Sequence, residues 1–193
     1  MDRLLLRNYR SIRNTISSGD MLLYRYGGGL FSRGIAAAGR SIYSHVAMAA
    51  WWDDRLFALE TRAWIGGTAT LLSNYVENYP DRVDVYKAGI TDRQREVAVD
   101  WMKSATGKKY GWGTTLSHAA RLSPILSMFL SAPLADDRHK RLPVCSELVS
   151  RAYREAGADP IPNLSDKATL PGDLARSTMF EYKFTLSSLR DCA

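Results

Sequence analysis

The segment YSHVAMAAWWDDRLFALETR, residues 43–62, decides the fold that we expect for this chain. Two apolar runs flank Asp53-Asp54, residues that favour a tight turn, so the segment predicts a β-hairpin. Each arm carries one titratable group among apolar residues, His45 in the first and Glu60 in the second. Such groups are stable in a hydrophobic hairpin only where they have polar partners or lie at an exposed edge. The hairpin therefore raises the question of what these two side chains do.

The register of the hairpin determines whether the two groups can meet. If Asp53-Asp54 forms a two-residue turn, His45, Ala47 and Glu60 share one face, because side chains alternate along a strand. The opposite pairs in this register are Trp52–Arg55, Ala47–Glu60 and His45–Arg62. His45 and Glu60 are then diagonal neighbours within reach of each other. A shift by one residue would separate them onto opposite faces, so the pairing depends on the turn.

An acid beside an imidazole can serve catalysis or only complete local hydrogen bonding. The acid can orient the ring through Nδ1–H, and it favours the imidazolium, as a catalytic base requires. Alternatively, Glu60 bridges Arg62 at the surface, and His45 is simply satisfied. The hairpin alone leaves both interpretations open.

A nucleophile for such a pair occurs in LPVCSELVSRAYREAG, residues 142–157. Apolar residues recur there at helical spacing, at Leu148, Val149, Ala152, Tyr153 and Ala156. Gly157 is typical of a helix end, so Cys145 falls at or near the helix N-terminus. Free backbone N–H groups and the helix dipole stabilise a thiolate at that position. Beside His45, the thiol could form a thiolate–imidazolium pair.

Other cysteines and histidines leave alternatives. Cys145 could instead be a small buried apolar residue, and Cys192 is interpreted as a tail thiol without function. Two cysteines without a C-x-x-C pair predict neither a disulfide framework nor a thiolate metal site. His118 and His139 compete with His45 as bases, but neither lies in a predicted strand.

Further elements predict an α+β domain with mostly antiparallel strands. Expected helices cover residues 2–16, 30–38, 91–107 with a Thr91–Gln94 capping box, 114–131, and 145–157. Further strands are expected near residues 19–26, 69–72, 83–88 and 181–186.

Composition favours one soluble domain covering residues 1–193, because 46% of the chain is hydrophobic and 24% is charged. The net charge of +6 is compatible with anionic partners but selects none, and no nucleic-acid partner is expected. The glycines at residues 27–29 lack the spacing of a nucleotide-binding loop. The amino end has no apolar core typical of a secretory signal, and the apolar stretch 122–135 is too short to span a bilayer. We therefore expect a cytoplasmic protein without a transmembrane segment.

Six segments together resemble the permuted NlpC-type papain-like family, in its YiiX-like form. They are GDMLLYR, YSHVAMAAWW, ALETRA, GKKYGWG, CSELVSRAY and PGDLARS, and they span about residues 19–177. In these family members the histidine strand precedes the cysteine helix, the order found here. The resemblance implies a circularly permuted papain-like fold, in which a small antiparallel sheet packs against the cysteine-bearing helix.

The resemblance also implies roles for individual residues. Cys145 is implied as the nucleophile, His45 as the base and Glu60 as the third polar residue. The family's active-site tyrosine corresponds to Tyr110, and neither a cofactor nor a metal ion is implied. We also expect Ser44 and Trp112 to contact the substrate, although Tyr110 and Trp112 could instead be core aromatics beside a loop. One departure from the family is a long insert, residues 114–141, which we expect to form a lid or a wall of the substrate groove.

Three functions are compatible with these residues. The first is a cysteine amidase or peptidase that hydrolyses a small peptide, such as a cell-wall stem peptide, through an acyl-enzyme on Cys145. The second is a thiol acyltransferase or a lipid or thioester hydrolase, with peripheral membrane contact through the apolar and basic segment 122–141. The third is a catalytically idle module that binds an anionic polymer.

Overall fold

The computed structural model describes residues 5–62, 65–108 and 145–187, which form a seven-stranded sheet covered by helices. The order of the strands across the sheet is β1-β7-β6-β2-β3-β4-β5. The strands are β1 (Leu6–Asn8), β2 (Met21–Arg25), β3 (Tyr43–Trp52), β4 (Arg55–Arg62), β5 (Gly66–Leu71), β6 (Val83–Ala88) and β7 (Phe180–Ser187). All neighbours pair antiparallel except β1 and β7, which are parallel. The predicted mixture of helices and mainly antiparallel strands is confirmed, in a larger sheet than expected.

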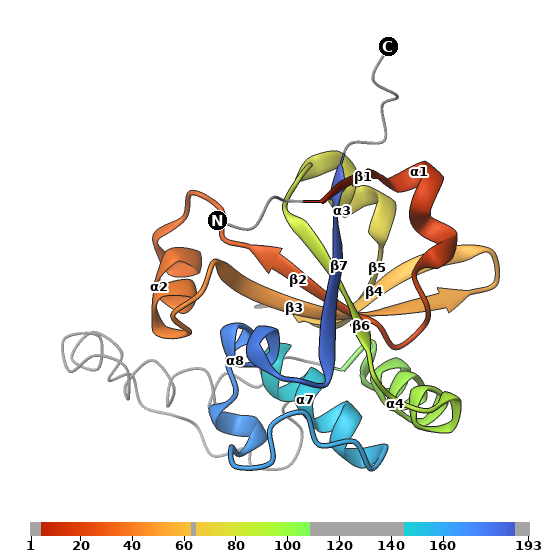
Figure 1. Ribbon diagram of the computed structural model, residues 1–193, viewed down its shortest axis with the longest axis vertical. Coiled ribbons are helices and arrows are strands. Elements are labelled where there is room, and N and C mark those ends of the chain that lie inside the picture. The colour runs from red at the N-terminus through yellow and green to blue at the C-terminus, as the bar shows by residue number, and fades with distance from the viewer. Residues whose placement is uncertain (1–4, 63–64, 109–144, 188–193) are drawn as a thin grey trace.

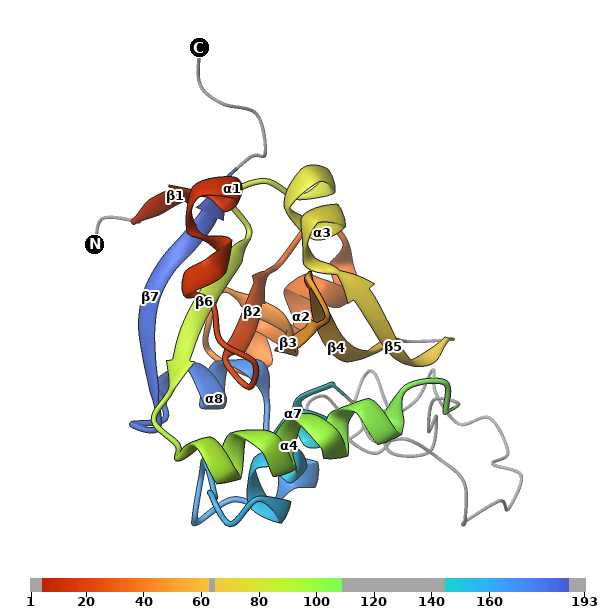
Figure 2. The same cartoon turned by 90° about the vertical axis from the view of Figure 1, so that its right-hand side faces the viewer.

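Helices cover both faces of the sheet. They are α1 (Tyr9–Ile12), α2 (Leu30–Ala38), α3 (Leu72–Asn78), α4 (Asp92–Ala105), α7 (Cys145–Glu155) and α8 (Pro171–Arg176), with 3-10 turns η1 (Arg13–Thr15) and η2 (Asp166–Ala168). Figures 1 and 2 show α4, α7 and α8 on one side of the sheet and α1 and α3 on the other. The sheet is therefore the middle layer, and α7 lies directly against it.

Two apolar cores form because successive side chains of a strand point to opposite faces. In β2, Met21 and Leu23 belong to the core beneath α4 and α7, whereas Leu22 and Tyr24 belong to the core beneath α1 and α3. All four side chains are buried. A strand that is apolar on both faces must lie in the interior of the sheet, which is where β2 is found.

The hairpin has the predicted bounds and the predicted turn. Asp53 adopts a left-handed backbone with φ of 53°, and Trp52 pairs with Arg55. The β3–β4 ladder runs from that pair to Met48–Leu59. The expected pairs Ala47–Glu60 and His45–Arg62 follow the same register but lie beyond the last paired residues.

The amphipathic helix predicted over residues 2–16 is wrong at Leu6–Asn8, which form a strand, and is reduced to the short turns α1 and η1 after it; residues 2–4 lie outside the described residues. Leu6 pairs with Thr185 in a short strand, and Asn8 then caps the single turn α1 by accepting a hydrogen bond from the N–H of Arg10. The strand covers the edge of β7, and Tyr9 and Ile16 are buried in the core beneath α1 and α3. Pairing with a distant strand thus overrides the local helical pattern.

The motif PGDLARS, residues 171–177, is explained by a close backbone approach. A Cβ atom on Gly172 would lie 2.4 Å from the carbonyl oxygen of Gly39, so no other residue fits without movement. Pro171 opens α8, and Asp173 accepts a hydrogen bond from the N–H of Leu170 at 2.9 Å. The motif therefore fastens α8 to the end of α2.

Several predictions lie outside the described residues. These are the helix over 114–131, the insert 114–141 with its membrane-contacting segment 122–141, and the single-domain assignment of the complete chain. Within the described ranges, no helix is both long and apolar enough to cross a membrane.

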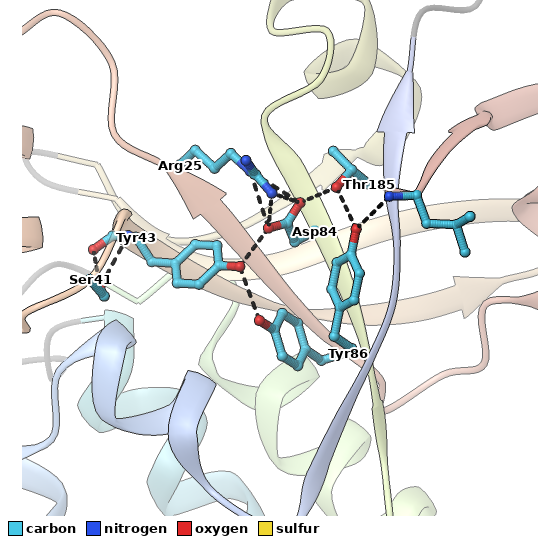
Figure 3. Close-up of polar contacts among 8 residues, drawn as sticks. Arg25, Ser41, Tyr43, Asp84, Tyr86 and Thr185 are labelled. Carbon is cyan, nitrogen blue, oxygen red and sulfur yellow. Dashed lines mark hydrogen bonds and ion pairs between the residues drawn. The ribbon is translucent and has the colours of Figure 1, made fainter. Parts of the chain in front are cut away.

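A buried carboxylate joins four neighbouring strands of the sheet. Figure 3 shows Asp84 of β6 accepting hydrogen bonds from Arg25 at 2.8 Å, Tyr43 at 2.5 Å and Thr185 at 2.6 Å. These partners belong to β2, β3 and β7. The carboxylate is fully buried, so the Arg25 guanidinium supplies the counter-charge that its burial requires.

We expect Asp84→Asn to lower the free energy of unfolding by about 3 kcal/mol, because the amide leaves Arg25 without its counter-charge. Denaturant titration measures the change. The matched control is Glu96→Gln, which removes an exposed 3.4 Å ion pair with Arg93. The control should change the free energy by less than about 0.5 kcal/mol. Equal effects of the two substitutions would show that the Asp84 cluster does not stabilise the sheet.

Candidate functional site

Cys145 is the first residue of α7, as the apolar spacing predicts. Leu148, Val149, Ala152 and Tyr153 are buried against the sheet, and the Tyr153 hydroxyl donates to the carbonyl of Gly19 at 2.9 Å. This anchoring fixes the rotation of the helix and directs its N-terminus toward β3. The half-buried Cys145 side chain there forms a hydrogen bond with His45.

His45 lies on β3 opposite Tyr24 of β2. The ring centroids of Tyr24 and His45 are 5.2 Å apart at a tilted angle, and a quarter of the His45 side chain is exposed. The aromatic contact holds the ring at the sheet surface while leaving one part open to a substrate.

Glu60 of β4 forms an ion pair with His45 across the hairpin, and the Glu60 side chain is fully buried. Its Oε2 lies 2.5 Å from Nε2 of His45. Its Oε1 accepts hydrogen bonds from Tyr75, from Thr70 at 3.3 Å and from Thr68 at 3.4 Å. The carboxylate is thus fixed on both oxygens, which limits the orientations open to the imidazole.

The ring atom that meets the acid differs from the prediction. We expected Glu60 to bond Nδ1, but the structure places Nε2 against the carboxylate. Nδ1 is therefore the nitrogen left for exchange of a proton with Cys145. The sequence could not give this detail, because residue spacing along β3 does not specify which ring nitrogen faces which neighbour.

The surroundings of Cys145 favour its thiolate. Burial alone would raise the pKa of the thiol, but the charge and hydrogen bond of His45 outweigh it and lower the pKa below its ordinary value. The backbone N–H groups of Val46 and Ser146 also hydrogen-bond to the sulfur. Val46 can serve this role because it lies past the end of the β3–β4 ladder.

The surroundings of His45 favour its protonated form. Burial works against the charge, but Cys145 and Glu60 together raise the pKa of His45 to about 10. Burial likewise opposes ionisation of Glu60, yet the hydrogen bond and charge of His45 hold the pKa of that carboxyl below its ordinary value. The three groups therefore favour a thiolate, an imidazolium and a carboxylate near neutral pH.

Sequence reasoning missed the residues that hold Glu60. Thr68 and Thr70 alternate along β5 on the face of Glu60, and Thr68 pairs directly with it. That signal was available in the sequence, because hydroxyls two residues apart on a neighbouring strand can bind one carboxylate. Tyr75 comes from α3, a helix that we did not predict, so no spacing along the chain indicated it.

Of the other residues predicted for the site, the structure describes Ser44 alone. Ser44 lies beside His45 in β3 and is half-buried. Tyr110, Trp112, His118, His139 and Cys192 all lie outside the described residues. Their predicted roles and interpretations stay predictions.

We expect Glu60→Gln to raise the pKa of Cys145 by about 1, because an amide cannot stabilise the imidazolium that holds the thiolate. Ultraviolet absorbance of the thiolate during a pH titration measures this pKa. Thr70→Val is the matched control, since it removes one hydrogen bond to Glu60 and keeps the charge. An unchanged thiol pKa in Glu60→Gln would mean that the acid does not act on Cys145 through His45.

A strand histidine, an acid and a helix-terminal cysteine thus form the candidate site. No protein-family model and no curated protein sequence matches the chain. Among solved structures, the fold is similar to that of the metalloprotein YiiX from Escherichia coli O157:H7, with a TM-score of 0.61. The match covers 88% of this chain and 97% of that chain at 17% identity, so it defines a YiiX-like fold.

The name of that structure raises the question of a metal site here. In the described part of the chain, no group of three or more His, Cys, Asp or Glu side chains is placed to hold a metal ion. The described residues thus do not supply the ligand set of a metal ion.

Proposed function

We propose that this chain is a cysteine-dependent hydrolase with a permuted papain-like site, which cleaves an amide bond of a small peptide through an acyl-enzyme on Cys145. The observation that carries the proposal is the contact of the helix-terminal thiol with an imidazole whose other nitrogen lies 2.5 Å from a buried carboxylate. A nucleophile, a proton carrier and a group that orients the carrier are the parts required for acyl transfer.

The first half of the reaction forms the acyl-enzyme. The Cys145 thiolate attacks the carbonyl carbon, and the C–N bond breaks as the His45 imidazolium donates its proton to the leaving amine. The N–H of Cys145 at the start of α7 can donate to the oxyanion that develops. Glu60 stays ionised and keeps the ring oriented throughout.

The second half releases the product. The neutral His45 takes a proton from water, which attacks the thioester carbon, and the thiolate leaves as the carboxylic acid product forms. The imidazolium is regenerated, so the site returns to its starting charge state. A thiol or hydroxyl acceptor in place of water would make the same intermediate an acyl donor, which is the acyltransferase alternative.

Parallel assays with a small peptide amide and a fatty-acyl thioester test the bond class. We expect the peptide amide to be hydrolysed by the wild-type protein. Exclusive turnover of the lipid thioester would favour the acyltransferase or lipid hydrolase over the amidase. No turnover, combined with equal labelling of Cys145 and Cys192 by iodoacetamide, would favour the idle binding module.

We expect kcat/KM for the accepted substrate to follow a bell-shaped pH profile. The rate rises as Cys145 loses its proton, at a pH below the ordinary range of a thiol, because only the thiolate attacks. The rate falls near pH 10, where His45 loses the proton that it donates to the leaving group. A profile that rises through one step at an ordinary thiol pKa and then stays level would contradict the ion-pair mechanism.

A further inference from the structure

A hollow of about 300 Å³ opens beside the imidazole of the candidate site. Residues that line it include His45, Tyr24, Thr61, Arg25, Arg62 and Arg82, and no acidic residue lines it. Because His45 also hydrogen-bonds to Cys145, the hollow and the thiol are neighbours across one ring. A group bound in the hollow would therefore belong to a molecule within reach of the nucleophile.

Of these three arginines, only Arg82 has a positive charge that no acidic side chain of the described residues pairs with. Arg25 is committed to Asp84 through hydrogen bonds from Nε and Nη2. Arg62 reaches only to 3.9 Å from Glu60, whose carboxylate is already occupied by His45 and other donors. Arg82 has no side-chain hydrogen bond or ion pair with any described residue. The hollow thus carries the unpaired charge of Arg82, beside the charge of Arg62, whose acidic partner Glu60 is shared with His45.

Two residues that line the hollow also have hydroxyl groups without hydrogen-bond partners. Within the described chain, the hydroxyls of Tyr24 and Thr61 are buried and have no hydrogen-bond partner. Tyr24 is 7% exposed and Thr61 is 2% exposed, so water does not compensate them. An unsatisfied buried hydroxyl is unfavourable, and both belong to side chains that line the hollow. A bound group with acceptor oxygens would pair with the Arg82 guanidinium, and a side-chain rotation of Tyr24 or Thr61 would let it accept from these hydroxyls as well.

We propose that this hollow binds an anionic oxygen group of the substrate, a carboxylate or a phosphate, and that Arg62 and Arg82 are its binding residues. The inference rests on the proposed function, because it concerns the molecule that Cys145 attacks. It adds a substrate class to that function, namely acyl compounds with an acidic group close to the reacting carbonyl. The volume suits one side chain or one phosphate rather than a polymer.

Three alkylating probes test the inference on the intact protein: the N-bromoacetyl derivatives of glutamate α-amide, glutamine α-amide and phosphoserine α-amide, in which only the side chain can carry a charge. In each case the Cys145 sulfur forms a bond to carbon as the carbon–bromine bond breaks and bromide leaves. The glutamate and glutamine probes differ only in one anionic group. We expect the glutamate probe to label Cys145 about tenfold faster than the glutamine probe, as for a charge-assisted hydrogen bond. A larger ratio for phosphoserine would identify phosphate as the preferred group, and a larger ratio for glutamate would identify carboxylate.

The arginine variants determine where the preference arises. Arg82→Gln should reduce the glutamate-to-glutamine ratio to about threefold, and the Arg62→Gln/Arg82→Gln double variant should bring it near one. Arg82→Lys should retain part of the ratio, because it keeps the charge without the planar fork. Arg93→Gln on α4 removes the same charge from an exposed, distant position and should leave the ratio unchanged. Circular dichroism confirms that each variant is folded.

The outcomes separate this inference from the proposed function. If the glutamine probe labels Cys145 much faster than a free thiol, but neither anionic probe exceeds it, the site is reactive and the anion pocket is wrong. A preference for the glutamate probe that persists in the Arg62→Gln/Arg82→Gln variant would also contradict anion binding in the hollow. If all three probes label Cys145 no faster than a free thiol, the proposed function fails first.

Discussion

Replacing Cys145 by alanine is expected to lower turnover of the accepted substrate by at least about 10⁴-fold. The reason is that, among the residues that the structure describes, Cys145 supplies the nucleophile that hydrogen-bonds to the His45 imidazole. The surrounding fold should be retained, because Cys145 is half-buried at the start of α7, whereas the buried residues that anchor the helix, such as Leu148 and Tyr153, follow it. Steady-state hydrolysis of the peptide amide by the purified variant measures the effect.

The control for this variant is Ser150→Ala, on the same helix. Ser150 is buried and donates to Asp166 at 2.7 Å, so its loss tests the packing of α7 without touching the thiol. We expect that control to lose stability but retain most of its turnover. Full activity in Cys145→Ala would exclude both enzymatic functions considered for this chain.

The second large effect is expected from His45→Ala, which should slow alkylation of Cys145 by iodoacetamide at pH 6. Without the imidazolium, burial and the ordinary acidity of a thiol leave only a small fraction ionised at that pH. We expect the rate to fall on the order of tenfold to a hundredfold. Mass spectrometry of the labelled peptide follows Cys145 separately from Cys192.

Arg95→Gln supplies a comparison for the histidine variant. Arg95 forms a 3.0 Å ion pair with Asp20 and lies on α4, so it changes a buried charge pair without contacting Cys145. Its alkylation rate at pH 6 should match that of the wild-type protein. An unchanged rate in His45→Ala would show that the imidazole does not ionise the thiol.

The hairpin and the cysteine helix could be predicted because their signals are local. Alternation fixes the face of His45 and Glu60 once the turn is known, and helical spacing fixes where Cys145 falls. Neither signal depends on the rest of the chain. The contact between His45 and Cys145 follows from their placement only if α7 lies against β3, which the resemblance implied and the spacing did not.

The remaining features depend on contacts between distant segments. Leu6–Asn8 becomes a strand because it pairs with residues near 185, although the segment alone favours a helix. Tyr75 reaches Glu60 only because α3 folds back over the sheet after β5. Likewise, Arg82 joins the hollow next to His45 from the loop before β6, a distance along the chain that no motif connects.

The most direct test of the central claim is the intact mass of the protein after a substrate reaction is stopped with acid. The account predicts a population heavier by the mass of the acyl group, with the added mass on the peptide that contains Cys145. The Cys145→Ala variant should show no such population. Turnover by the wild-type protein with no acyl adduct at any time point, together with retained turnover in Cys145→Ala, would contradict the account.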